Sequence, residues 1–153
     1  MKHKLLAKYY QHPKYVLGGT QDDETDCSKL IGEAASEAGI PGAKKRPTAY
    51  SICTGKDGYP NKTVKNWAKG DQEDCDLICQ HFDVESEGGL VRPLGINHVV
   101  AVIEFKGLWH IIHASSSAKT VVLRPFKDWV ETHMIKNGYR RLTNGDPKPK
   151  EKK

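Results

Sequence analysis

Residues 24–41 read Glu-Thr-Asp-Cys-Ser-Lys-Leu-Ile-Gly-Glu-Ala-Ala-Ser-Glu-Ala-Gly-Ile-Pro. The apolar residues after the cysteine recur at helical spacing, and the closing glycine and proline are typical of a helix end. The pattern predicts a helix over residues 27–38 with Asp26 near its cap position. Cys27 then lies in the first turn, where free backbone N–H groups and the helix dipole favour a thiolate over a thiol.

A cysteine at a helix start has two interpretations. A thiolate is a nucleophile, and such a cysteine needs only a histidine as its base to become catalytic. The alternative is a small buried core residue, which is the usual place of a free cysteine. Asp26 is equally open, and we favour a helix cap over a direct chemical role.

The histidines downstream favour catalysis. Residues 96–105 read Ile-Asn-His-Val-Val-Ala-Val-Ile-Glu-Phe, and residues 108–117 read Leu-Trp-His-Ile-Ile-His-Ala-Ser-Ser-Ser. Two apolar runs around Lys106-Gly107 predict an antiparallel hairpin, with strands at about 98–105 and 108–114. His98 and His113 would then meet at the same end of the sheet. In this arrangement one imidazole deprotonates the thiol and the second group fixes its orientation.

These segments resemble, in this order, the NlpC/P60 cysteine peptidases of bacterial cell walls. The matching motifs are Tyr-x-x-Gly-Gly from Tyr15, Asp-Cys-Ser from Asp26, His-Val-x-x-x-Ile from His98 and Ile-His-Ala-Ser around His113. Together they cover residues 15–39 and 96–117. Asp76-Leu77-Ile78 also resembles the Gly-Asp-Leu strand of the family, with Cys75 in place of the glycine.

The resemblance implies a papain-like α+β fold, with a nucleophile helix packed on a central antiparallel sheet. It implies that Cys27 is the nucleophile, His98 the base and His113 the third polar member of the site. Tyr15 matches the tyrosine that faces the nucleophile in this family. We expect Tyr15, Asp26 and Ser28 to support the site, with N–H groups at the helix start stabilising the oxyanion.

Several features depart from the family pattern. Lys29 follows Asp-Cys-Ser, where the family usually has a small or aromatic residue. His110 lies three residues before His113, so on a regular strand the two point to opposite faces. Only one of them can face Cys27, and the Ile-His-Ala-Ser context favours His113. Residues 42–95 match little beyond Asp76-Leu77-Ile78 and are expected to carry the differences in substrate binding.

The resemblance implies hydrolysis of a peptide-stem amide bond in bacterial peptidoglycan, typically between D-glutamate and the third-position diamino acid. A phage lysin, a virion-associated hydrolase and an injected antibacterial effector would all carry this activity. The alternatives are a thiol acyltransferase or deamidase on the same scaffold, and a non-catalytic virion structural or wall-binding module. An immunity protein, phage components or a secretion machine are the expected partners besides the stem peptides.

Length and composition predict one catalytic domain over residues 1–146 and a basic, disordered tail over 147–153. No run approaches the roughly 20 apolar residues of a membrane span. The N-terminal residues do not resemble a secretory signal, so we expect synthesis in the cytoplasm and action in the periplasm or cell wall. The net charge of +5 suits an anionic wall or plain solubility. Nucleic acid is not an expected partner, and no motif indicates a cofactor.

The other three cysteines have weaker interpretations. A zinc site would need two closely spaced pairs, and only Cys75 and Cys79 are close in sequence, so no metal is expected. A disulfide from Cys53 to either Cys75 or Cys79 would suit an oxidising compartment, and the sequence does not decide between them.

The remaining pattern predicts an α+β order of elements. It predicts helices over 3–11, near 48–52, over 62–69 and over 126–135, and strands over 76–82, 119–124 and 139–142, with loops over most of 42–61 and over 85–95. Trp67, Trp109 and Trp129 are expected in the core or lining a groove.

Overall fold

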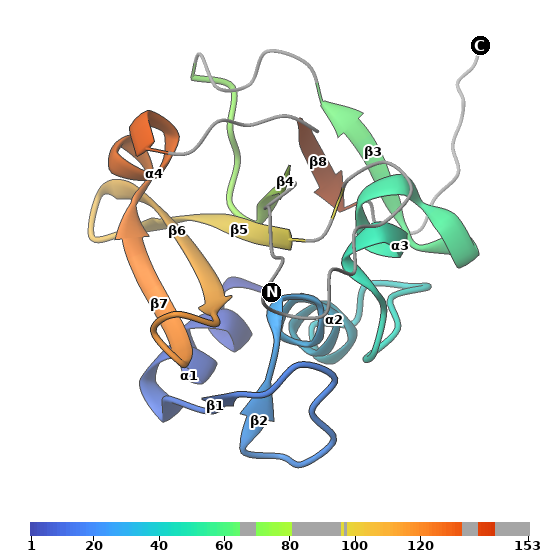
Figure 1. The fold of residues 1–153 in the computed structure, drawn as a ribbon. Coiled ribbons are helices and arrows are strands. Elements are labelled where there is room, and N and C mark those ends of the chain that lie inside the picture. The colour runs from blue at the N-terminus through green and yellow to red at the C-terminus, as the bar shows by residue number, and fades with distance from the viewer. Residues whose placement is uncertain (65–69, 81–95, 97, 133–137, 143–153) are drawn as a thin grey trace, which may run out of the picture.

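The computed structural model of the chain describes residues 1–64, 70–80, 96, 98–132 and 138–142 (Figure 1). A six-stranded antiparallel sheet with the order β3-β8-β4-β5-β6-β7 forms its centre. The strands are β3 (Asn61–Val64), β4 (Asp76–Gln80), β5 (His98–Phe105), β6 (Leu108–Ser115), β7 (Thr120–Pro125) and β8 (Tyr139–Leu142). Two short parallel strands, β1 (Lys14–Tyr15) and β2 (Glu24–Thr25), precede the second helix.

Helices cover both faces of this sheet. They are α1 (Lys2–Gln11), α2 (Cys27–Glu37), α3 (Ala49–Thr54), the 3-10 turn η1 (Lys56–Gly58) and α4 (Phe126–Thr132). In Figure 1, α3 and β3 lie at one side of the sheet, and β7 and α4 lie at the other. Among the described residues, no helix is both long and apolar enough to cross a membrane.

The core follows from the alternation of side chains along the strands. One face of β5 packs with α2 in a first cluster that includes Leu30, Ile31, Val99, Ala101 and Ile103. The other face packs under α4 in a second cluster of Ile78, Val100, Val102, Ile111 and Trp129. Because both faces are covered, β5 carries an unbroken run of buried apolar residues from Val99 to Ile103.

The predicted α+β fold class is therefore confirmed, with the cysteine-bearing helix packed on an antiparallel sheet. The predicted hairpin is also observed, in a register that pairs Ala101 with Ile112 and Phe105 with Leu108. Its two-residue turn places Lys106 and Gly107 at φ 53° and 81°. Two consecutive positive φ angles are typical of the turn whose twist matches that of a hairpin.

The predicted helix over residues 62–69 is wrong in its first part. Asn61–Val64 form β3, which pairs antiparallel with β8 so that Lys62 lies opposite Arg141. The partner strand comes from a distant part of the chain, and its pairing outweighs the weak local helical pattern. Residues 65–69, including Trp67, the loop over 85–95 and the tail over 147–153 lie outside the described residues.

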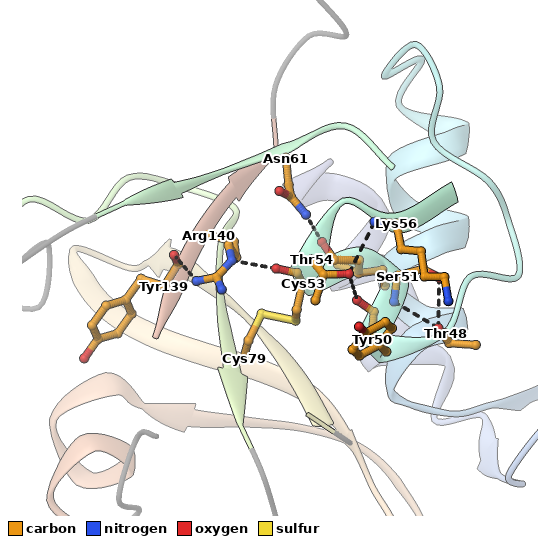
Figure 2. Close-up of a disulfide and its surroundings, with 11 residues drawn as sticks. Thr48, Tyr50, Ser51, Cys53, Thr54, Lys56, Asn61, Cys79, Tyr139 and Arg140 are labelled. Carbon is orange, nitrogen blue, oxygen red and sulfur yellow. Dashed lines mark hydrogen bonds between the residues drawn. A yellow bond between two sulfur atoms is a disulfide. The ribbon is translucent and has the colours of Figure 1, made fainter. Parts of the chain in front are cut away.

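A disulfide joins Cys53 of α3 to Cys79 of β4 (Figure 2). It selects one of the two pairings that the sequence left open, and neither Cys27 nor Cys75 takes part in it. Two side chains also hold the last carbonyls of α3: Arg140 Nε donates to Cys53 O at 2.6 Å, and Asn61 donates to Ile52 O. The short helix α3 is thus fastened to β3, β4 and β8.

Candidate active site

Cys27 is the first residue of α2, as predicted, and Asp26 is its N-cap. The Asp26 Oδ1 atom accepts from the backbone N–H of Lys29 at 2.8 Å and from the Ser28 hydroxyl at 3.1 Å. The Asp26 Oδ2 atom accepts from the backbone N–H of Gly18 at 2.8 Å. Asp26 therefore caps the helix, which is the interpretation that the sequence favoured, and also ties the Gly18 loop to the helix start.

Tyr15 reaches this region through the short pairing of β1 with β2. Tyr15 lies opposite Thr25, one residue before Asp26, and its side chain packs against the cluster that contains Cys27. The Gly-Gly pair that follows β1 lets the chain turn back so that β2 can pair with β1. Gly18 has a φ of 71°, and a Cβ on Gly19 would lie 2.8 Å from the Cβ of Glu24. Side chains at these positions would strain the turn or collide with β2.

Lys29 has a structural explanation. Its side chain is buried, and its ammonium group donates to the carbonyls of Gln21 and Glu24, each at 2.7 Å. A buried ammonium group needs such partners, because leaving water without them costs free energy. The lysine that departs from the family pattern therefore fastens the loop between β1 and β2 to α2.

The electrostatic setting of Cys27 differs from the expectation. Burial, together with the nearby Asp26 carboxylate, raises the pKa of the Cys27 thiol to about 12. The backbone N–H groups of Cys27, Ser28 and Val99 hydrogen-bond to the sulfur and lower the pKa, as a helix start should. The expected effect of the helix start is therefore present, but desolvation is larger and keeps the thiol the favoured form. The thiol needs a base to ionise near neutral pH.

His98 and His113 form a buried pair at one end of the sheet. The distance between His98 Nε2 and His113 Nδ1 is 2.9 Å, and the two rings meet edge to face. One of these nitrogens must carry the shared proton and the other must accept it. Since His113 engages Nε2 of His98, Nδ1 is the nitrogen with which His98 can take a proton.

The backbone connects this histidine pair to Cys27. His98 is the first residue of β5, and the N–H of the next residue, Val99, hydrogen-bonds to the Cys27 sulfur. The sulfur therefore lies against the start of the strand that carries His98. The structure thus brings Cys27, His98 and His113 to one end of the sheet, with Tyr15, Asp26 and Ser28 around the helix start.

His110 lies elsewhere, as predicted from its spacing. It pairs with Ile103, in the half of the hairpin that leads to the turn, and its ring contacts Phe105 at a centroid distance of 5.7 Å. Its Nδ1 atom lies 2.9 Å from the carbonyl oxygen of Leu108. It therefore does not share the face on which His98 meets His113.

Two residues of this region were missed by the sequence analysis. Gln80 ends β4 directly opposite His98, and the Trp129 ring packs against His113 with centroids 4.7 Å apart. Trp129 was expected only as core or groove lining. The sequence signal that could have singled out Gln80 is a polar residue that directly follows the apolar run Leu-Ile-Cys. In the structure, every residue of that strand is buried.

No model of a known protein family matches this chain, and no curated protein matches it in sequence. Among solved structures, the chain is similar to NlpC1 from Trichomonas vaginalis, with 22% sequence identity and a TM-score of 0.59. The similarity covers 84% of this chain and 38% of that chain, so this chain spans well under half of the similar structure. The likeness shows the fold: an NlpC-like, papain-like α+β domain.

Proposed function

We propose that this chain is a cysteine peptidase or amidase that hydrolyses an amide bond in the peptide stems of bacterial peptidoglycan. The observation that carries the proposal is the Cys27 thiol at the start of α2, beside a His98–His113 pair whose nitrogens are 2.9 Å apart. The NlpC-like fold supports a hydrolase of this class. The stem-peptide substrate follows from the resemblance of the motifs around Cys27, His98 and His113.

The first half of the reaction begins with proton transfer. Because burial keeps Cys27 protonated, His98 Nδ1 takes the thiol proton as the sulfur attacks the amide carbonyl. The carbonyl π electrons move to its oxygen, and backbone N–H groups at the start of α2, with Tyr15, stabilise that oxyanion. His98 then gives its proton to the amide nitrogen, the C–N bond breaks, and an amine leaves behind a thioester on Cys27.

The second half restores the enzyme. His98 takes a proton from a water molecule as the water oxygen attacks the thioester carbonyl. The C–S bond breaks, the carboxylic acid is released, and the Cys27 thiol regains its proton from His98. His113 accepts a hydrogen bond from Nε2–H of His98 throughout, which holds the tautomer with its basic nitrogen at Nδ1.

We further propose that the protein acts outside the cytoplasm, in the periplasm or the cell wall. The Cys53–Cys79 disulfide supports this site of action, because such bonds persist in oxidising compartments (Figure 2). The net charge of +5 would concentrate the protein near an anionic wall. A phage lysin, a virion-associated hydrolase and an injected effector would share this chemistry and differ in how they are delivered.

The test is digestion of purified muropeptides of defined stem composition, followed by mass spectrometry. We expect two fragments whose masses sum to the substrate plus one water, and no cleavage by Cys27→Ala. Cys75→Ala, at the other cysteine outside the disulfide, is the matched control and should cleave at the wild-type rate. Loss of ammonia without chain cleavage would identify a deamidase, and capture of an added amine would identify a transferase. An intact substrate across several stem types would overturn the proposal in favour of a non-catalytic role.

A further inference from the structure

Gln80 is a buried amide with one of its two polar ends paired. It is fully buried at the end of β4, directly opposite His98. Its Oε1 atom accepts a hydrogen bond from Trp129 Nε1 at 3.2 Å. Its Nε2 atom has no hydrogen-bond partner among the described residues. An unpaired buried donor costs free energy, so the amide calls for a physical explanation.

The acceptor oxygen supplies that explanation. A methionine or leucine would fill the same buried volume without leaving a donor unpaired. Neither could accept a hydrogen bond from the indole N–H of Trp129, and a buried tryptophan N–H usually needs such a partner. What Gln80 adds over an apolar residue is therefore a fixed position for the Trp129 ring.

That ring is packed on the histidine pair. Trp129 is buried in α4, and its ring lies 4.7 Å from the His113 ring at an interplanar angle of 59°. His113 is bonded in turn to His98, which lies opposite Gln80 in the neighbouring strand. The four side chains come from β4, β5, β6 and α4. Gln80 contacts Trp129, Trp129 contacts His113, and His113 contacts His98, so the contacts form one unbroken chain.

We infer that Gln80 and Trp129 are positioning residues that hold the His113 ring in register with His98 Nε2, so that His98 Nδ1 serves Cys27. This inference rests on the proposed function, because it assigns a support to the base of that reaction. Gln80 acts through Trp129, and Trp129 acts through its contact with His113.

Two variants test this support, the first with little change in volume and the second with the loss of part of a ring. Gln80→Met removes the acceptor and leaves the indole in place, and Trp129→Phe removes the N–H and keeps an aromatic ring. We expect each to lower kcat on muropeptides, on the order of tenfold to a hundredfold, with KM unchanged. The double variant should lose little more than the worse single variant, because both substitutions interrupt the same contact.

A second readout does not depend on the substrate. Alkylation of Cys27 by iodoacetamide reports how well His98 takes the thiol proton, since the thiolate is the reactive form. Asp26, Tyr15 and the two histidines are titratable groups near Cys27 among the described residues. We expect both variants to shift the pH profile of Cys27 alkylation toward alkaline pH. Ile78→Val is the matched control, because Ile78 belongs to the same apolar cluster as Trp129, and it should leave the profile unchanged.

The outcomes separate this inference from the proposed function. A folded Gln80→Met protein with wild-type kcat and a wild-type alkylation profile would overturn the support, even if the wild type cleaves muropeptides. A shifted profile in a protein that cleaves no muropeptide would uphold the support and refute the proposed substrate. If Trp129→Phe does not fold, Gln80→Met decides alone. A shift in Ile78→Val as large as that in Gln80→Met would also refute the inference, because packing alone would then explain it.

Discussion

The two ends of β4 carry buried polar residues that differ in how they are paired. At the first residue, the Asp76 carboxylate accepts two hydrogen bonds from the Arg141 guanidinium, at 2.7 and 2.8 Å, and one from the backbone N–H of Glu73. At the last residue, Gln80 is paired at its oxygen alone, next to the two histidines. The fully paired end ties β4 to β8, and the partly paired end adjoins the candidate site.

This contrast distinguishes a buried polar pair that stabilises the fold from buried polar groups that are suited to catalysis. The Asp76–Arg141 pair satisfies a charge inside the fold, and nothing about it needs to move a proton. The opposite end holds a thiol and two imidazoles whose protons must be shared and transferred. Substitutions at the Asp76 end should therefore lower the stability of the fold, and substitutions at the histidine end should lower the activity.

The largest effect should come from Cys27→Ala. We expect complete loss of muropeptide cleavage, because no other group can form the thioester, and a thermal unfolding midpoint close to that of the wild type. Circular dichroism melting and the cleavage assay measure the two effects on one sample. Cleavage at the wild-type rate by this variant would end the catalytic interpretation of this end of β4.

The histidines should rank in the order His98, His113, His110. His98→Ala removes the base and the proton donor, so kcat/KM should fall on the order of 10²- to 10⁴-fold. His113→Ala removes only the hydrogen bond that holds the base and should cost less. His110 lies on the other face, so His110→Ala is the control and should keep wild-type activity. A loss from His110→Ala equal to that from His98→Ala would contradict the register of the hairpin.

The alkylation of Cys27 should depend on pH in a way that reveals its base. Burial raises the pKa of this thiol to about 12, so the thiolate alone is scarce below that pH. In His98→Ala, the rate at neutral pH should therefore collapse and recover only as the pH rises toward the pKa of the thiol. Cys75 has a pKa raised by burial to about 11 and is the internal reference. Its labelling, measured by peptide mass spectrometry, should be the same in both proteins.

The smallest effect on activity should come from the other end of the strand. Asp76→Asn leaves the Arg141 guanidinium without its buried partner and should lower the free energy of unfolding by about 3 kcal/mol. Cleavage measured below the unfolding range should be unchanged. Glu73→Gln is the matched control, because its carboxylate also contacts Arg141, at 3.1 Å, from an exposed position. The Glu73→Gln change should lower the free energy of unfolding by less than about 1 kcal/mol. A large activity loss in Asp76→Asn would contradict the distinction between the two ends.

Most elements of the fold could be predicted because their signals are local. The helix at Cys27, the hairpin around Lys106-Gly107 and the last strand at 139–142 all depend on periodicity and turn residues within a few positions. The meeting of His98 with His113 follows from the hairpin alone, since antiparallel strands return to the same end. Their chemical roles, and that of Cys27, stay predictions.

The wrong, open and missing predictions concern places where distant segments decide the outcome. Residues 61–64 form a strand only because β8 lies beside them, and no feature of that segment indicates its partner. The choice of Cys79 over Cys75 for the disulfide depends on where α3 docks. The high pKa of Cys27 depends on how deeply the helix start is buried. The supports at Gln80 and Trp129 depend on α4 covering one end of the sheet.

The sequence by itself determined the α+β class, the helix that begins at Cys27 and the hairpin that joins His98 to His113, because each rests on short-range spacing. Only the tertiary structure decided which cysteine pairs with Cys53, that Lys29 fastens the loop before α2, and that Gln80 and Trp129 adjoin the histidines. The physical reason is the same in each case. Burial and pairing depend on what the rest of the chain places beside a residue, and desolvation can then outweigh a local effect such as the helix dipole at Cys27.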